Sequence, residues 1–566
     1  MTPLRAGLHV RGRGTSLTLE GSRALPALWQ LLAPRLGPDP EPEPVGEPTG
    51  ERVAAALATV TARLREYDLL VDHPDGVELP PWPGSVADRP AQAAAELAAA
   101  RPVVAAADPD GLPLAEAVAR ALRRAGATPT VVAEPGLAAG LVLVADGTVA
   151  VAVQGDADGG FVTAPADPAR TRADATTLAA SLGTSSTPPP PALTALLAGA
   201  AAHRLLCAVA GLPDPADPVD PVGAPADAPT AAEGVPPSDA PPGDPRLLAG
   251  RPAVLVAEAH PLRADHHPWA AAPGPVAAPP EHLAEALRRI TALGDPRLGV
   301  IDAPAPGALS QLPVPLVSCR TPSGTLVAGA VRTDLARLAA ACRSVELHLA
   351  DTELADTELA APVVGADPDH ALGRALRRAA HALPAVPVGP GAAGWRDHPQ
   401  AAHWWTTLTR SLGTAPDLTI SQLVAGQAFM AVLRLPSPAA GTPPVVLGRA
   451  VEATPADAVA VAALAALTRR TAAAHGLAAA HHTTLSGAAA PLAAAGLRPA
   501  AWTDEGWTDR WLTALAAREP ELQAALLHTT GLRVAVWHPV APAARSLANA
   551  LQGCGFTALV PTEGPR

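Results

Sequence analysis

The first seventy residues hold the pattern that most restricts how this chain can fold. Two short runs of alternating apolar and polar residues, 8–11 and 16–20, flank a Gly-Arg-Gly turn and predict a β-hairpin. Two apolar stripes at helical spacing follow; their members are Leu25, Leu28, Trp29, Leu32 and Leu36, then Val53, Leu57, Val60, Leu64 and Tyr67. These elements predict a small winged-helix-like module whose sheet edge stays open.

This order of elements resembles the peptide-recognition domain (RiPP recognition element) of ribosomal-peptide modification systems, which binds the leader segment of a precursor peptide. In that family the leader adds as a further strand at the sheet edge and lies against the last helix. The resemblance implies an acceptor strand that carries Leu17 and Leu19. Leu64 and Tyr67 would line the facing helix.

Two other interpretations of the module are a winged helix for nucleic acid and a simple N-terminal cap. The second helix carries Arg52, Arg63 and Arg65, but also Glu51 and Glu66, and the formal net charge of the chain is -12. Phosphate binding needs a basic face, so we expect no nucleic-acid partner. The cap interpretation stays open.

The composition excludes several kinds of chemistry. The sequence contains no lysine, so all 41 basic residues are arginine. Walker-type phosphate loops, Schiff bases and Ser-Lys pairs are therefore excluded. The four cysteines have no paired spacing, which fits neither a disulfide framework nor a zinc ribbon; they are Cys207, Cys319, Cys342 and Cys554.

The N-terminus lacks the apolar segment of a signal peptide, so we expect a cytoplasmic protein with no membrane partner. The most apolar window, residues 192–212, has His203 and Arg204 near its middle. Charges at a bilayer centre are costly, so this window predicts a buried helix.

Residues 101–153 alternate strand-like and helix-like segments, which predicts a parallel sheet. The glycine pattern of a dinucleotide-binding turn is missing after the first strand, where the sequence reads Asp108-Pro109-Asp110-Gly111. The order of elements up to Trp269 is similar to the ubiquitin-activating-like (ThiF-like) fold in its degenerate form. The zinc-binding cysteine pairs of that family are absent. A nearby group, His260, His266 and His267, fits a polar loop better than a metal site.

The last part of the chain repeats one arrangement, in which strands lead into a long Ala-rich helix. Strands are predicted at 298–301 and 315–318 and a helix around 329–349; further along, strands at 431–435 and 445–450 precede a helix at 455–474. This order resembles the YcaO family, which uses ATP to convert peptide Cys, Ser and Thr to azolines. In active members, glutamates on the two long helices hold magnesium and the nucleotide phosphates.

Those carboxylates are missing here. The first long helix keeps only Glu346, beside Arg337 and Arg343, and residues 459–474 of the second contain no carboxylate and include Arg469 and Arg470. The resemblance therefore implies a chain without a nucleotide site or metal of its own. Tryptophans gather in the last third and indicate either core packing or a protein interface; they are Trp395, Trp404, Trp405, Trp502, Trp507, Trp511 and Trp537.

Together these patterns predict an α/β multidomain protein. Its parts would be a winged-helix-like leader-binding domain (1–92), a degenerate ThiF-like, Rossmann-type domain (93–275) and a degenerate YcaO-like α+β domain (276–566). We expect a leader-binding partner subunit with no catalytic, cofactor-binding or metal-binding residues, which serves a separate catalytic YcaO-type cyclodehydratase. The resemblance implies azole-containing products such as thiopeptides, and ATP and magnesium in the partner; a homodimer within the complex is left open.

Two rival hypotheses differ in class. The first is a catalytically complete cyclodehydratase with an atypical ATP site, which requires five carboxylates to converge; they are Glu281, Glu285, Glu346, Glu452 and Asp457. The second is a winged-helix transcription regulator, which the acidic balance opposes.

Overall fold

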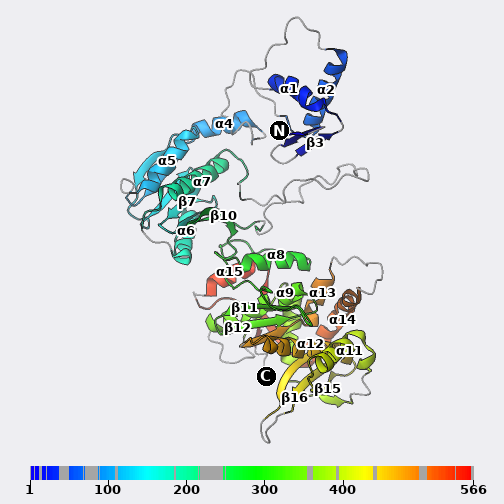
Figure 1. The fold of residues 1–566 in the computed structure, drawn as a ribbon. Helices are drawn as coiled ribbons and strands as arrows, with labels where there is room; N and C mark the ends of the chain where they lie inside the picture. The colour runs from blue at the N-terminus through cyan, green and yellow to red at the C-terminus, as the bar shows by residue number, and fades with distance from the viewer. Residues whose placement is uncertain are drawn as a thin grey trace. The chain divides into compact units, whose positions relative to one another are not determined.

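The computed structural model shows a mixed α/β chain with several separate sheets. It describes residues 2–4, 7–11, 16–20, 22–36, 50–67, 69–70, 87, 89–108, 112–183, 187–214, 216, 247–248, 250–352, 361–389, 394–436, 443–477, 479–495, 506–541 and 544–562. The chain divides into two compact units, Met1–Ala249 with Ala253–His266, and Gly250–Pro252 with His267–Arg566 (Figure 1). The division into three domains stays a prediction.

The N-terminal module contains the predicted hairpin and one strand that the sequence did not reveal. Its elements are β1 (Thr2–Leu4), β2 (Gly7–Arg11), β3 (Ser16–Glu20), α1 (Leu25–Leu32), the 3-10 turn η1 (Ala33–Leu36) and α2 (Glu51–Glu66). β2 pairs antiparallel with both neighbours, so the order is β1-β2-β3. Alternate residues Leu8, Val10 and Leu17 face a core that Leu57 and Val60 of α2 complete. This two-residue alternation is the reason the hairpin could be predicted.

The rest of the first unit is built on a seven-stranded sheet in the order β10-β9-β8-β7-β6-β4-β5. Its elements are α4 (Pro90–Ala99), β4 (Val103–Ala106), α5 (Pro113–Arg124), β5 (Thr130–Ala133), β6 (Leu141–Asp146), β7 (Val149–Gly155), β8 (Gly159–Val162), α6 (Pro168–Leu182), α7 (Pro191–Val209), β9 (Ala253–Ala259) and β10 (Leu262–Pro268).

The expectation of a parallel sheet is wrong for most of these strands. β4 and β5, which α5 connects, are parallel, whereas β4 pairs antiparallel with β6, and the pairs from β6 to β9 are also antiparallel. Parallel neighbours need a long crossover, but only a tight turn at Gly147, with a φ of 58°, joins β6 to β7. The short turn therefore makes this pair a hairpin.

The apolar window is helix α7, and the first unit packs much of it into its core. Leu197, Ala201 and Leu205 are buried there, and Arg204 is buried as well, with its Nη2 2.8 Å from Asp214 Oδ2. Among the described helices, α7 is long and apolar enough to meet the criteria for a membrane span, and 56% of its most apolar window is buried inside the protein. Core helices meet the same criteria, so the finding is weak evidence for a membrane span.

The second unit holds the two long helices. Its elements are α8 (Leu283–Leu293), β11 (Leu316–Thr321), β12 (Gly324–Gly329), α9 (Thr333–Thr352), β13 (Val363–Gly365), α10 (Pro368–Ala380), β14 (Val386–Val388), η3 (Trp395–Asp397), α11 (Pro399–Thr406), the π-helix η4 (Thr407–Ser411), β15 (Asp417–Val424), β16 (Ala428–Leu435), β17 (Val445–Glu452), α12 (Pro455–Ala474), β18 (His481–Thr484), η5 (Gly487–Ala489), α13 (Ala490–Ala494), α14 (Trp507–Thr530), β19 (Arg533–Val536), α15 (Arg545–Gly553) and β20 (Thr557–Thr562).

Three small sheets, β11-β12-β18, β13-β20-β19 and β14-β15-β16-β17, organise this unit. α9 packs on β11 and β12. α12 contacts strands of two sheets, β16 and β17 of one sheet and β12 and β18 of another. A Cβ at Gly448 of β17 would collide with the carbonyl oxygen of Ala462, so α12 lies directly against that strand.

The strand predicted at residues 298–301 is wrong. Asp295 Oδ1 accepts the backbone N–H groups of Arg297 and Leu298, each at 2.9 Å, and Val300 N donates to the carbonyl of Leu293. An Asp side chain that accepts hydrogen bonds from nearby backbone N–H groups favours a turn over the hydrogen-bond pattern of a sheet. The segment therefore closes helix α8 as a turn.

Candidate functional site

In the N-terminal module, β3 stands at the edge of the described sheet, which leaves one side of the strand without a described partner. Leu17 of β3 and Leu64 of α2 share the buried core, and Leu64 is 1% exposed. Leu19 is half-buried and packs against the same core. Tyr67, which caps α2, is 40% exposed. A role in leader binding stays a prediction for all four residues, and Tyr67 is the most accessible of them.

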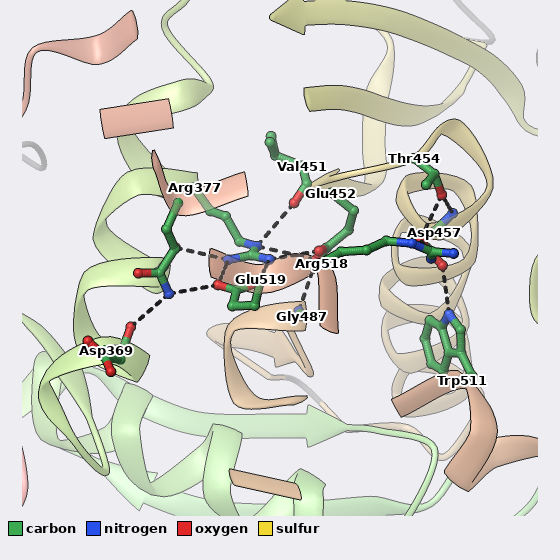
Figure 2. A network of polar contacts seen from close by, with 12 residues as sticks. Asp369, Arg377, Val451, Glu452, Thr454, Asp457, Gly487, Trp511, Arg518 and Glu519 are labelled. Atoms are coloured by element: carbon green, nitrogen blue, oxygen red, sulfur yellow. Dashed lines mark hydrogen bonds and ion pairs between the residues drawn. The ribbon is translucent and has the colours of Figure 1, made fainter. Parts of the chain in front are cut away.

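In the second unit, Arg377 of α10 lies between two buried glutamates (Figure 2). Its Nη1 and Nη2 each lie 2.7 Å from an oxygen of Glu519 on α14, and Nη2 also lies 2.7 Å from Glu452 Oε2 at the end of β17. The backbone N–H of Gly487 donates to Glu452 Oε1 at 2.9 Å. A Cβ at Gly487 would collide with the Glu452 carboxylate, so glycine permits this approach.

The charges of this group depend on one another. Burial alone would lower the pKa of Arg377, but Glu452 and Glu519 outweigh it and hold that pKa above its ordinary value. Burial raises the pKa of Glu452, and Arg377 offsets only part of the effect. The guanidinium therefore stays charged and acts as the counter-ion of both carboxylates, an arrangement that is costly to break on one side.

Asp457, in the first turn of α12, is the centre of a second network in Figure 2. Trp511 Nε1 donates to its Oδ1 at 2.8 Å, and Arg518 Nη1 donates to its Oδ2 at 2.7 Å. Its backbone N–H also donates to the hydroxyl of Thr454, the N-cap residue of α12, at 3.1 Å. Asp457 thus joins α12 to α14.

Glu346 of α9 lies among three arginines. Arg374 Nη1 lies 2.7 Å from its Oε1, while Arg343 and Arg378 contact its Oε2 at 3.0 and 3.1 Å. The backbone N–H of Val364 completes the group at 3.0 Å. Burial would raise the pKa of Glu346, but the arginines outweigh it and lower that pKa, so the carboxylate is ionised at neutral pH.

These contacts show that the five carboxylates do not form one magnesium site. Both oxygens of Glu346, Glu452 and Asp457 are engaged by arginine, tryptophan or backbone donors. Glu285 pairs with Arg289 in α8 and accepts the backbone N–H of Glu281. Magnesium needs oxygen ligands in octahedral geometry, and here arginines and other donors already bind these carboxylate oxygens. Within the described parts of the chain, no group of three or more His, Cys, Asp or Glu side chains could hold a metal ion.

The histidine group does not form the expected polar loop. His266 and His267 lie on strand β10, and His260 precedes that strand. His267 Nδ1 lies 3.0 Å from both carboxylate oxygens of Asp295, and both side chains are buried. The His267 side chain therefore has a structural role in the second unit, as the buried partner of Asp295.

Most of the described tryptophans noted in the sequence pack inside the second unit. Trp395, Trp404, Trp511 and Trp537 are buried, and Trp405 and Trp507 are half-buried. Trp502 lies outside the described residues. Core packing therefore accounts for the four buried tryptophans, because each indole ring buries a large apolar area.

Helices α10 and α14, which supply the arginines and Glu519, were not predicted. One sequence signal could have revealed α10, because Asp367 followed by Pro368 has the form of an N-cap with proline at the first helical position. Nothing local pairs Arg377 with Glu519, since 142 residues separate them.

A cavity of about 550 Å³ lies between β17, α12 and β18, next to the Arg377 group. In the described sheets β17 is the last strand of one and β18 the last strand of another, so an edge strand of each sheet lines the cavity. Arg449, Arg469 and Arg377 line it together with His381, His481 and His482.

Comparisons with known proteins place the chain near no family by sequence. No family model matches it, and no curated protein matches it. Among solved structures, the chain is similar to one described as "Structure of the heterocyclase TruD", with 14% sequence identity, a TM-score of 0.40, and coverage of 98% of this chain and 92% of that chain. A likeness at this level says nothing about activity.

Proposed function

We propose that this chain is the leader-binding partner of a separate YcaO-type cyclodehydratase that forms azolines from Cys, Ser and Thr in a ribosomal precursor peptide. Residues 1–92 would bind the leader, residues 93–275 would form a degenerate ThiF-like domain, and residues 276–566 a degenerate YcaO-like domain. The proposal includes a cytoplasmic location for the protein, and it assigns ATP and magnesium to the catalytic partner.

The observation that carries the proposal is the edge strand β3 on a sheet with its own core. A sheet edge supplies the backbone donors and acceptors that an added peptide strand needs, while neighbouring side chains select its register. Tethering the leader would raise the concentration of the core peptide at the partner's active site to the millimolar range for a short linker.

The arginine-bound carboxylates of the second unit support a non-catalytic role. An enzyme that binds magnesium and nucleotide would need free carboxylate oxygens, and those of Glu346, Glu452 and Asp457 already have donors. The rival hypothesis of a complete cyclodehydratase would require these ion pairs to open.

The test begins with a search of the neighbouring genes for a short precursor rich in Cys and Ser and a second YcaO-type gene. It then uses the full chain, the leader of that precursor and the protein from the second gene. Fluorescence anisotropy should show leader binding to this chain alone, and a phosphate-release assay should show ATP turnover with the partner but not without it. Turnover by this chain alone at the rate of the pair would establish the rival enzyme. Leader binding that survives deletion of residues 1–90 would remove the assignment of the module.

A further inference from the structure

The cavity between β17, α12 and β18, here called the β17–β18 pocket, carries an excess of positive charge. Arg449 of β17 and Arg469 of α12 both line it, and Glu452 is its carboxylate among the described lining residues. Glu452 is already bound by Arg377. The chain as a whole has a net charge of -12, so a pocket of the opposite sign is not a consequence of composition.

The two arginines, not the histidines, supply that charge at neutral pH. Burial and Arg449 lower the pKa of His381 to about 4, and burial, Arg469 and His481 lower the pKa of His482. Burial and Arg343 likewise lower the pKa of His481. The three histidines therefore present neutral rings, each with one nitrogen that donates and one that accepts a hydrogen bond. Among the described residues, the Arg449 guanidinium has no hydrogen-bond or ion-pair partner, and its side chain is exposed.

Two polar atoms of the pocket lining are buried without a partner. These are His381 Nδ1 and Ser486 Oγ. Buried polar atoms are nearly always hydrogen-bonded, so an orphan needs an explanation. Both orphans belong to residues that line the same cavity as Arg449, which is the arrangement expected if a bound molecule completes their hydrogen bonds.

The pocket fits a small molecule better than a peptide strand. Arg469 Nη1 donates to the carbonyl oxygen of Val446, and Arg377 Nε donates to that of Val451 at 3.1 Å. These arginines occupy the edge of β17, so an added strand would have to displace them. The volume of about 550 Å³ lies within the range of small-molecule sites.

We propose that the β17–β18 pocket binds a small ligand that carries an oxyanion group, either a phosphate or a carboxylate, without a divalent metal. Arg449 and Arg469 would contact the oxyanion, since guanidinium groups form paired, charge-assisted hydrogen bonds with such groups. His381 and Ser486 would bind the uncharged part. This second binding function is independent of the leader-binding proposal.

Isothermal titration calorimetry on the full chain tests it, with pyrophosphate and succinate as probes and EDTA present throughout. Binding of either probe is the expected result. Binding of pyrophosphate would show that the oxyanion group of the ligand is a phosphate, and binding of succinate that it is a carboxylate. Arg449→Ala should weaken binding by about tenfold or more, the loss of one strong charge-assisted hydrogen bond. Arg469→Ala should do the same.

Arg470→Ala is the matched control, because Arg470 follows Arg469 on α12 and is exposed outside the pocket lining. It should leave binding unchanged. If Arg469→Ala fails to fold, Arg449→Ala still decides, since its exposed side chain has no described partner. Three results would overturn the proposal: no binding of either probe, equal binding by all variants, or binding only when magnesium replaces EDTA. Binding of an acidic peptide that is lost in Arg449→Ala, with no binding of either probe, would instead identify the pocket as a peptide site.

Discussion

Arg377 of α10 and Glu519 of α14 form a two-point ion pair, with Nη1 and Nη2 of the arginine each 2.7 Å from one carboxylate oxygen. Arg377 Nη2 also lies 2.7 Å from Glu452 Oε2, which links both helices to the end of β17. The pair is buried, and it joins segments that lie 142 residues apart in the sequence. Three elements of the second unit therefore share one counter-ion.

Removing that counter-ion should destabilise the second unit. We expect Arg377→Ala to cost about 3–5 kcal/mol, because two buried carboxylates would lose their positive partner. Urea unfolding followed by tryptophan fluorescence reports the effect, since Trp404 and Trp511 lie buried in this unit. Arg470→Ala, at an exposed position, should change stability by less than about 0.5 kcal/mol. Equal midpoints for the two variants would contradict the assigned role of Arg377.

Asp457 should matter for the junction of α12 with α14. Asp457→Ala removes the acceptor of Trp511 and Arg518 and leaves the indole N–H buried without a partner. We expect a loss of about 2–4 kcal/mol, as for a buried charged hydrogen-bond acceptor. Asp417→Ala, at an exposed position on β15, is the control. Hydrogen exchange of α12 and α14 would show whether the loss is local, and unchanged protection there would count against this contact.

Acid should destabilise the second unit through His370. Burial, followed by Arg374 and Arg377, lowers its pKa to about 3, and its Nδ1 accepts the backbone N–H of Ala366 at 3.1 Å. The unfolded chain binds this proton near pH 6.5 and the folded chain only near pH 3, so stability falls as the pH decreases between those values. The contribution is about 2 kcal/mol between pH 6.5 and pH 5.

The variant His370→Asn separates this group from the other histidines, because the asparagine Oδ1 can accept the same N–H without titrating. Its melting temperature should fall less between pH 7 and pH 5 than that of the unchanged chain. His528→Asn, at an exposed position, should keep the original slope. Identical slopes for His370→Asn and the unchanged chain would show that His370 is not the titrating group.

Leu64 and Tyr67 should behave differently although both were predicted to line the leader groove. Leu64 is 1% exposed, so Leu64→Ala should cost about 2–5 kcal/mol and reduce the hydrogen-exchange protection of α2. Tyr67 is 40% exposed, so Tyr67→Ala should keep that protection and weaken leader binding by about 1 kcal/mol or more. If Tyr67→Ala leaves the leader affinity unchanged, the groove lies elsewhere on the module.

The four cysteines should react slowly in the folded chain. All four are buried and free, and burial is the main cause that raises the pKa of Cys342 and Cys554 to about 12 and of Cys207 and Cys319 to about 11. The thiolate is the reactive form, so little of it exists at pH 8. Labelling with Ellman's reagent should be slow before urea is added and complete at four thiols afterwards. Fast labelling of the folded chain would show that a cysteine is accessible.

The elements that sequence alone determined are those whose signal is local. The hairpin of β2 and β3 follows from two-residue alternation, and α12 begins and ends at Pro455 and Ala474 as predicted, because its apolar stripe and N-cap Thr454 are neighbours along the chain. The sequence alone also shows that lysine is absent, which excludes chemistry that needs a lysine side-chain amine.

Only the tertiary structure decided which groups meet. It placed arginines of α10 on Glu346 and Glu452, Trp511 and Arg518 on Asp457, and Leu64 in the buried core of the N-terminal module. It also made most of the first unit's large sheet antiparallel. The physical reason is range: periodicity and capping act over a few residues, whereas the desolvation of a charge and the direction of a strand depend on partners far away in the sequence.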